Sequence, residues 1–228
     1  MSTEVEIQVE ADGEAAARAL AELLAGQAGQ GGSIVLTGGS SVRRAYELAA
    51  GLEPDWSSVE LWWGDERCVP PDDERSNYGL AKAALLDRLR EQPRAVHRMR
   101  GELGRAEGAA DYERELEGVG TFDFMLLGLG PDGHLASLFP NQPALEETER
   151  AAIGNEPGLE PFVDRITLTL PRLRDARRVV FVVTGDGKAD AVRRAFASEP
   201  SHATPGSLVR AGHGPTLAIL DRAAAAGL

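Results

Sequence analysis

The sequence predicts an α/β domain whose mostly parallel sheet is covered by helices on both faces. Two observations support this prediction. Short apolar segments alternate along the chain with segments whose apolar residues recur at helical spacing. Several of the short segments, such as Val179–Val183, are apolar throughout, which is typical of strands buried on both faces. The 228 residues suffice for a substantial core, and we expect one domain spanning residues 1–228.

The expected strands are short. Val5–Val9 alternates between polar and apolar residues, and Ile166–Leu170 alternates as Ile-Thr-Leu-Thr-Leu. We therefore expect the second of these to be half-buried or at a sheet edge. The other expected strands are residues 33–36, 59–63, 122–127, 179–183 and 216–220. The stretch Asn141–Pro161 is rich in Glu, Pro and Gly, and we interpret it as a long surface excursion.

Helices are expected between these strands. Asp12 is the expected N-cap of the first helix, and Ser76 is the expected N-cap of a later one. Further helices are expected at residues 42–50, 107–117 and 190–197. Gly51 and Pro54 are expected to end the first of these three. Residues 107–117 are largely polar, so we expect that helix to be exposed.

The composition excludes several classes of function. Lys and Arg number 24 against 36 Asp and Glu, a formal net charge of −12. This balance argues against a nucleic-acid or anionic-membrane partner, but it does not exclude a small phosphorylated substrate. Cys68 is the single cysteine, which excludes an intrachain disulfide and a cysteine-based zinc site. We see no signal peptide and no apolar run long enough to span a bilayer, so we expect a cytoplasmic domain. The sequence leaves the oligomeric state open, and we favour a monomer.

Polar loops that contain glycine follow four of the expected strands. The carboxyl ends of parallel strands meet at one edge of a sheet, where α/β proteins bind ligands. The loops after residues 36, 63, 127 and 183 should therefore form one crevice. The side chains gathered there would be Ser40, Arg67, Asp132, His134 and Lys188.

Two of these loops fit a bound anion. Gly38 and Gly39 would let the backbone approach a ligand, and Ser40 offers a hydroxyl where a helix starts with free N–H groups. The alternative is a tight turn with a serine N-cap. Lys188 also stands at a helix start, where a cation opposes the helix dipole. A phosphate between the lysine and the helix end would explain this, and the alternative is an exposed surface lysine.

The other two loops supply a candidate base and a second cation. His134 follows a glycine-rich strand end, and a neighbour such as Asp132 would tune it as a general base. The alternative is an ordinary surface histidine. Arg67 would bind a phosphate or carboxylate through its guanidinium, or else form an internal ion-pair cluster with Asp65 and Glu66.

Two cofactor classes are not expected. No pair of histidines has the spacing of a metal-binding helix, so we expect no metal site. Residues 128–133 formally match the dinucleotide-binding pattern G-x-G-x-x-G. However, Pro131 and Asp132 interrupt the turn, and the region twenty residues further on is not a clear strand ending in an acid. Nicotinamide binding is therefore not expected.

Five stretches resemble the 6-phosphogluconolactonase family. They are LTGGSS (36–41), WWGDERCVPPDDERSNYGLA (62–81), FDFMLLGLGPDGHLASLFP (122–140), ITLTLPRL (166–173) and VVFVVTGDGKADAV (179–192). They cover nearly the whole chain in the family's order. The related glucosamine-6-phosphate deaminases share a glycine-rich DGH loop, but GDER and ASLFP resemble the lactonase branch. The first loop departs slightly, because Val42 follows GGSS where the family commonly has GGSTP.

This resemblance implies a Rossmann-like three-layer α/β/α sandwich. It also implies hydrolysis of 6-phospho-D-glucono-1,5-lactone to 6-phospho-D-gluconate in the oxidative pentose phosphate pathway, without metal or cofactor. His134 would be the catalytic base, supported by Asp132. The residues expected to bind or support the substrate are Gly38, Gly39, Ser40, Arg67, Asn77 and Lys188.

Two other functions compete with this expectation. One is a sugar-phosphate isomerase or deaminase of the same fold, in which Asp65 or Glu66 would move a proton between adjacent carbons. The other is a non-catalytic sugar-phosphate sensor. The chain has no spare length for a helix-turn-helix, and its negative charge does not suit DNA.

Overall fold

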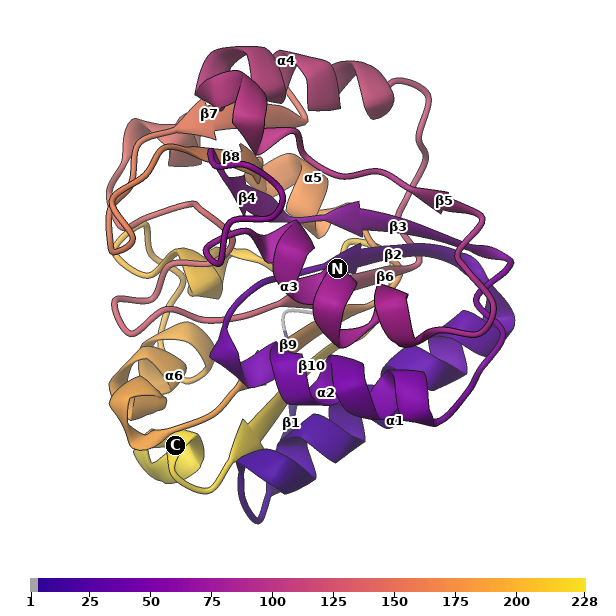
Figure 1. Ribbon diagram of the computed structural model, residues 1–228. Coiled ribbons are helices and arrows are strands. Elements are labelled where there is room, and N and C mark those ends of the chain that lie inside the picture. Colours follow the sequence, from indigo (N-terminus) through magenta and orange to yellow (C-terminus); the bar gives the residue numbers. More distant parts are fainter. Residues whose placement is uncertain (1–3) are drawn as a thin grey trace.

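The main sheet has seven strands, and every neighbouring pair is parallel (Figure 1). The computed structural model describes residues 4–228. In spatial order the strands are β1 (Val5–Glu10), β10 (Thr216–Asp221), β9 (Val179–Val183), β6 (Phe124–Leu127), β2 (Gly32–Leu36), β3 (Val59–Trp63) and β5 (Ala95–Val96). The three central strands β9, β6 and β2 are largely apolar and buried, which confirms the predicted parallel sheet.

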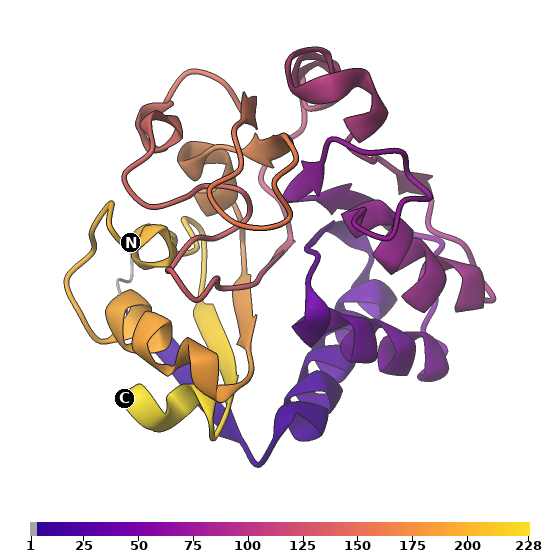
Figure 2. The same cartoon turned by 60° about the vertical axis from the view of Figure 1, so that its left-hand side comes forward.

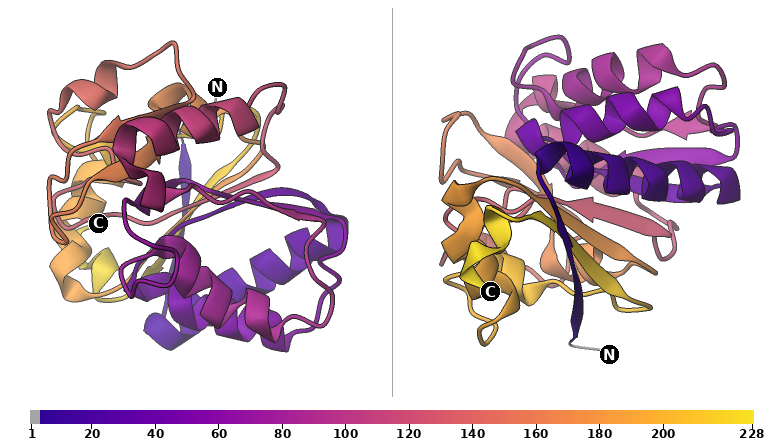
Figure 3. Two further views of the ribbon diagram at one scale, coloured as in Figure 1. Left: turned by 45° about the horizontal axis from the view of Figure 1, so that its top comes forward. Right: turned by 90° about the horizontal axis from the view of Figure 1, so that it is seen from below.

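Helices cover both faces of this sheet. On one face lie α1 (Gly13–Gln30), α2 (Ser40–Gly51) and α3 (Asn77–Ala84), which stack side by side (Figure 3). On the other side lies α6 (Ala189–Phe196) with the C-terminal segment (Figure 2). The three-layer α/β/α arrangement is therefore confirmed.

The predicted helix caps are also confirmed. The Asp12 carboxylate accepts a hydrogen bond from the Ala15 N–H at 2.9 Å. The Ser76 hydroxyl accepts one from the Gly79 N–H at 3.0 Å. Short 3₁₀ helices occur at Leu86–Arg88, Gly101–Leu103, Pro143–Glu146, Asp186–Lys188, Pro205–Leu208 and Ala224–Gly227.

A second, antiparallel sheet contradicts two expectations from the sequence, one for residues 166–170 and one for residues 141–161. It consists of β4 (Asp65–Arg67), β8 (Arg165–Leu168) and β7 (Ala152–Asn155) in that order. The expectation of a half-buried or edge strand at residues 166–170 is wrong, because β8 is the central strand and is fully buried. Its threonine is accommodated by hydrogen bonds, since the Thr167 hydroxyl accepts from the Ser137 N–H at 3.2 Å.

The stretch between residues 141 and 161 is more than a surface excursion, because it contains β7. The exposed helix expected at residues 107–117 is likewise only partly exposed. The helix α4 (Gly104–Glu115) packs on β7 and β8, and Tyr112 is buried. The Tyr112 hydroxyl donates to the Trp63 carbonyl at 3.1 Å and accepts from the Trp63 N–H at 2.9 Å. The polar residues of this segment correctly predicted that one face of the helix is exposed. They did not predict that Tyr112 would hold the helix to the backbone of Trp63. The remaining helix, α5 (Leu170–Arg174), follows β8.

Candidate active site

A cavity of about 250 Å³ lies at the carboxyl ends of β2, β3, β6 and β9. This volume is near the lower end of small-molecule sites, about 300 Å³. Seven of the eight predicted site residues line it: Gly38, Gly39, Ser40, Arg67, Asn77, His134 and Lys188. The eighth, Asp132, contacts the cavity through His134. The predicted convergence of loops at one sheet edge is therefore observed.

The His134 ring is held by the Asp132 carboxylate. Their Nδ1 and Oδ1 atoms are 2.6 Å apart, and Asp132 Oδ1 also accepts from the His134 N–H at 3.1 Å. Burial alone would raise the pKa of Asp132, but its hydrogen bonds and the charge interaction with His134 hold that pKa below its usual value. An ionised carboxylate only accepts hydrogen bonds, so a neutral His134 ring beside it carries its hydrogen on Nδ1 and has its lone pair on Nε2. The pair has the geometry of a general base and the group that orients it.

Gly130 provides space for this pair. A Cβ atom at that position would overlap the Nδ1 and Cε1 atoms of His134 and would lie 2.6 Å from Asp132 Oδ1. The ring also packs against Phe139, with 4.8 Å between centroids. The glycines of this loop thus allow the histidine to lie close over the backbone.

Another part of the cavity lining, at the start of α2, offers donors for an anion. Gly39 is the N-cap of α2 with φ 104°, a conformation that favours glycine, and a Cβ there would meet nothing within 4 Å. Ser40 begins the helix and is not its N-cap, so the alternative of a serine N-cap is wrong. The first N–H groups of α2 remain available at the positive end of its dipole.

Lys188 is half-buried and is not a surface lysine. Its Nζ donates to the Leu129 carbonyl at 2.7 Å. Burial lowers the pKa of Lys188, and the negative charge of Asp132 offsets part of that effect. A buried cation beside a helix start is suited to a phosphate, which would restore the interactions that the ammonium loses with water.

Arg67 faces the cavity and forms no ion pair with its acidic neighbours in the described chain. Its Nη1 donates to the Arg75 carbonyl, and its Nε is buried with no hydrogen-bond partner. The Asp65 carboxylate instead accepts from the Ser137 hydroxyl at 2.6 Å and from the Asn77 amide at 3.1 Å. The internal ion-pair cluster is therefore wrong, and no carboxylate among residues 4–228 pairs with the guanidinium.

Glu66 and Asn77 build the wall behind Arg67. The Glu66 carboxylate accepts from the backbone N–H groups of Arg67, Asn77 and Tyr78 and from the Ser76 hydroxyl, at 2.7–2.9 Å. Burial raises the pKa of Glu66, although these four donors oppose the shift. Glu66 is thus a structural acid, and Asn77 lines the cavity beside it.

Gly38 lines the cavity and also makes room for a neighbouring side chain. A Cβ atom at Gly38 would overlap the side-chain amide of Asn77. This glycine therefore admits a protein side chain, whereas Gly39 is the residue that leaves open space toward a ligand.

Sequence reasoning missed one wall of the cavity. Leu159 and Glu160 line it from the segment between β7 and β8. The Arg165 guanidinium anchors this segment by donating to the carbonyls of Leu159 at 3.2 Å and Pro161 at 2.7 Å. No pattern in the sequence marks this contact, because it depends on how the second sheet is placed.

Two further observations concern cofactors and membranes. Among residues 4–228, no three His, Cys, Asp or Glu side chains cluster in a way that would hold a metal ion. Within the same residues, no helix is both long and apolar enough to cross a bilayer.

Comparison with known proteins assigns the chain to a family. The model of the glucosamine-6-phosphate isomerases/6-phosphogluconolactonase family matches residues 8–218. The chain therefore belongs to this family of sugar-phosphate enzymes, as the resemblance implied.

The similar proteins within the family are mostly of one kind. The 6-phosphogluconolactonase of Streptomyces coelicolor is 40% identical over 94% of this chain and 89% of its own length. The human 6-phosphogluconolactonase is 40% identical over 83% of this chain and 78% of its own. The solved structure of the Trypanosoma brucei 6-phosphogluconolactonase covers the full length of both chains with a TM-score of 0.83 at 27% identity. A monomeric glucosamine-6-phosphate deaminase shares the fold, with a TM-score of 0.88 at 17% identity over 98% of this chain and all of its own.

Proposed function

We propose that this chain is a 6-phosphogluconolactonase, which hydrolyses 6-phospho-D-glucono-1,5-lactone to 6-phospho-D-gluconate in the oxidative pentose phosphate pathway. The lactonases described above support this reaction by their similarity over most of the chain. The observation that carries the proposal is one cavity lined both by His134, whose ring is hydrogen-bonded to Asp132, and by the half-buried cation Lys188. Hydrolysis of a phosphorylated lactone needs a base that activates water and a cation that binds the phosphate. His134, held by the Asp132 carboxylate, supplies the base, and Lys188 supplies the cation.

The proposed reaction begins with the neutral His134 ring. Its Nε2 removes a proton from water as the oxygen attacks C1 of the lactone. The tetrahedral oxyanion is stabilised by backbone N–H groups of the glycine-rich loops or by Arg67. The C1–ring-oxygen bond then breaks, and the protonated His134 returns its proton to the leaving alkoxide. The products are a carboxylic acid and a hydroxyl group, and no redox step is involved.

The phosphate acts as a remote handle. Lys188 and the N–H groups around Gly39 and Ser40 would bind it, and the binding energy would orient C1 toward the base. Asp132 would hold the ring in the required tautomer and stabilise its protonated form.

The test measures 6-phosphogluconate formed from fresh lactone, with the spontaneous rate subtracted. We expect activity in the wild-type protein and a loss of about 10²- to 10⁴-fold in kcat for His134→Asn, the usual contribution of a general base. The matched control is His202→Asn, because His202 pairs with Glu146 at an exposed site. A near-normal rate in His134→Asn would remove His134 from this role.

The isomerase or deaminase alternative is tested in the same preparation. Asp65 lines the cavity, but both of its oxygens already accept hydrogen bonds from Ser137 and Asn77. We therefore expect no turnover of glucosamine 6-phosphate. Turnover of that compound without lactone hydrolysis would favour the alternative.

A further inference from the structure

The loop that carries His134 and Asp132 is held in place by hydrogen bonds to its backbone carbonyl groups. We define the DGH loop as residues 129–134. Each of its six carbonyl groups accepts a hydrogen bond: Leu129 from Lys188 Nζ, Gly130 from the Gly133 N–H, Pro131 from Arg194 Nη2, Asp132 from Arg194 Nη1, Gly133 from the Gly206 N–H and His134 from the Gly130 N–H. Two cationic side chains, Lys188 and Arg194, thus supply three of the six donors.

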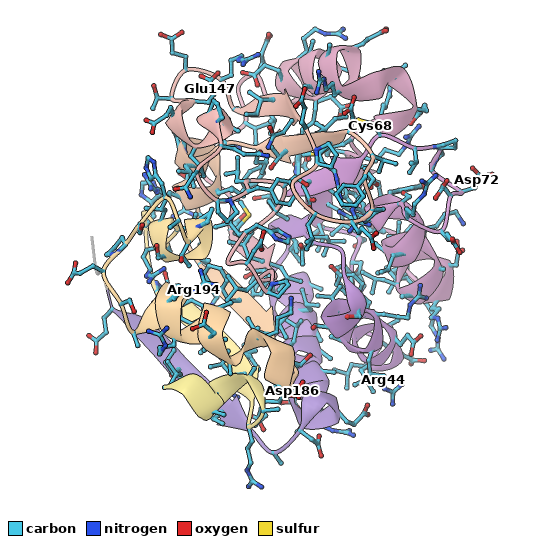
Figure 4. All side chains as sticks on the ribbon, turned by 90° about the vertical axis from the view of Figure 1, so that its left-hand side faces the viewer. Arg44, Cys68, Asp72, Glu147, Asp186 and Arg194 are labelled. Atoms are coloured by element: carbon cyan, nitrogen blue, oxygen red, sulfur yellow. The ribbon has the colours of Figure 1, made fainter. Side chains whose placement is uncertain are left out.

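Arg194 bridges the turn of this loop. Its Nη1 donates to the Asp132 carbonyl at 3.1 Å, and its Nη2 lies 3.3 Å from the Pro131 carbonyl. Nη1 also donates to the Thr204 hydroxyl at 2.8 Å, and Nε donates to Asp190 at 2.8 Å. Arg194 belongs to α6 and is labelled in Figure 4. The planar guanidinium spans acceptors that a lysine could not reach together.

We call Arg194 and its hydrogen bonds to the Pro131 and Asp132 carbonyls the clamp, and this clamp lies outside the cavity. The cavity lining includes His134 and Lys188 but not Arg194, and all three guanidinium nitrogens have protein acceptors. Arg194 is therefore not placed to bind substrate, and any effect on the reaction must pass through the DGH loop.

The turn that packs against Arg194 determines where the Asp132 and His134 side chains lie. Gly133 has φ 93°, and a Cβ there would lie 3.1 Å from Arg194 Nη1 and 2.8 Å from Thr204 Cγ2. The turn is therefore packed directly against the clamp. Asp132 and His134 flank this glycine, and their side chains meet at 2.6 Å. A shift of the turn would move both partners of that hydrogen bond.

We infer that Arg194 is a positioning residue for the reaction: it fixes the turn at 131–133 so that Asp132 holds the His134 ring with Nε2 free to act on water. The kinetic part of this inference rests on the proposed lactonase function, whereas the structural part does not. The segment 188–194 then has two roles, because it supplies the proposed phosphate anchor at its start and the loop clamp at its end.

The experiment compares Arg194→Ala and Arg194→Lys with Arg193→Ala as the matched control. Arg193 is the neighbouring residue on α6, and among residues 4–228 its guanidinium forms a hydrogen bond and ion pair with Asp190 alone. For Arg194→Ala we expect kcat to fall by at least about 10-fold and by up to about 100-fold, the loss that a misplacement near 1 Å can cause, with KM changed less than about threefold. Arg194→Lys should lie between, and Arg193→Ala should match the wild type.

The second readout is the low-field NMR signal of the imidazole proton between His134 and Asp132, assigned by its loss in His134→Asn. We expect this signal in the wild type and in Arg193→Ala, and we expect it to broaden or disappear in Arg194→Ala. This readout does not depend on turnover. Absence of lactone hydrolysis in the wild type would defeat the proposed function, while the NMR comparison would still decide the role of Arg194.

Two results would overturn the inference. One is a wild-type kcat with an intact imidazole signal in Arg194→Ala. The other is a raised KM with unchanged kcat, which would make Arg194 a binding residue. If Arg194→Ala does not fold, Arg194→Lys decides, because a wild-type kcat and signal in that variant would show that the guanidinium fork is not needed.

Discussion

Gly130→Ala is the substitution that tests the geometry of the catalytic pair most sharply. The new methyl carbon would overlap Nδ1 and Cε1 of His134 and would lie 2.6 Å from Asp132 Oδ1. Favourable contacts of a carbon atom occur at about 3.5–4.0 Å. The carboxylate must therefore move by about 1 Å, and the ring by more. These shifts would separate the Nδ1–Oδ1 hydrogen bond, which is 2.6 Å long in the native structure.

A misplacement of 1 Å costs about 10²-fold in rate, which corresponds to about 2.7 kcal/mol of barrier. We expect kcat for lactone hydrolysis to fall at least about 100-fold in Gly130→Ala. KM should change little, because Lys188 and the start of α2 are untouched. The assay is product formation from fresh lactone, with thermal unfolding measured in parallel to confirm the fold.

The control is Gly187→Ala in the neighbouring loop. A Cβ at Gly187 would meet nothing within 4 Å, so we expect a normal kcat. A folded Gly130→Ala variant with wild-type kcat would refute the reasoning, because it would show that the observed ring position is not required.

Two further predictions concern the anion anchor and the core. Since the pKa of Lys188 is lowered by burial, the ammonium loses its proton at a lower pH than a free lysine. The affinity for 6-phosphogluconate should therefore begin to fall, as the pH rises, below the ordinary lysine pKa of 10.5. The Lys188→Arg variant keeps its positive charge over this pH range, so its affinity for 6-phosphogluconate, measured by calorimetry, should stay nearly constant. The same change of affinity with pH in both proteins would contradict the phosphate contact. Tyr112→Phe should lower the free energy of unfolding by about 1–3 kcal/mol, because it leaves the buried N–H and carbonyl of Trp63 unsatisfied. Urea unfolding measures this change, with Tyr78→Phe as the control, and equal stability of the two variants would count against it.

The sequence predicted the parallel sheet because its central strands are apolar on both faces. Residues 124–127 and 179–183 must lie inside a covered sheet, and the loops after them must meet at its carboxyl edge. The convergence of His134 and Lys188 follows from this rule alone. The short strands of the second sheet could not be found in the same way, since β4 has three residues and β7 has four, too few to show a periodic pattern.

The polar contacts within the site were less predictable than its location. Position 130 is a glycine because the His134 ring occupies the space of a Cβ atom, and position 38 is a glycine because the Asn77 amide does the same. Neither contact can be recognised in the sequence. Arg194 is one of many arginines on helix surfaces in this sequence. Its contact with the DGH loop depends on the tertiary placement of α6, which no local pattern specifies.

The most direct test of the central claim is a crystal structure of the His134→Asn variant with bound 6-phosphogluconate. The account predicts that the phosphate lies against Lys188 Nζ and the start of α2, with the carboxylate carbon C1 nearest to residue 134. A sugar bound in the reverse direction, or outside this cavity, would contradict it.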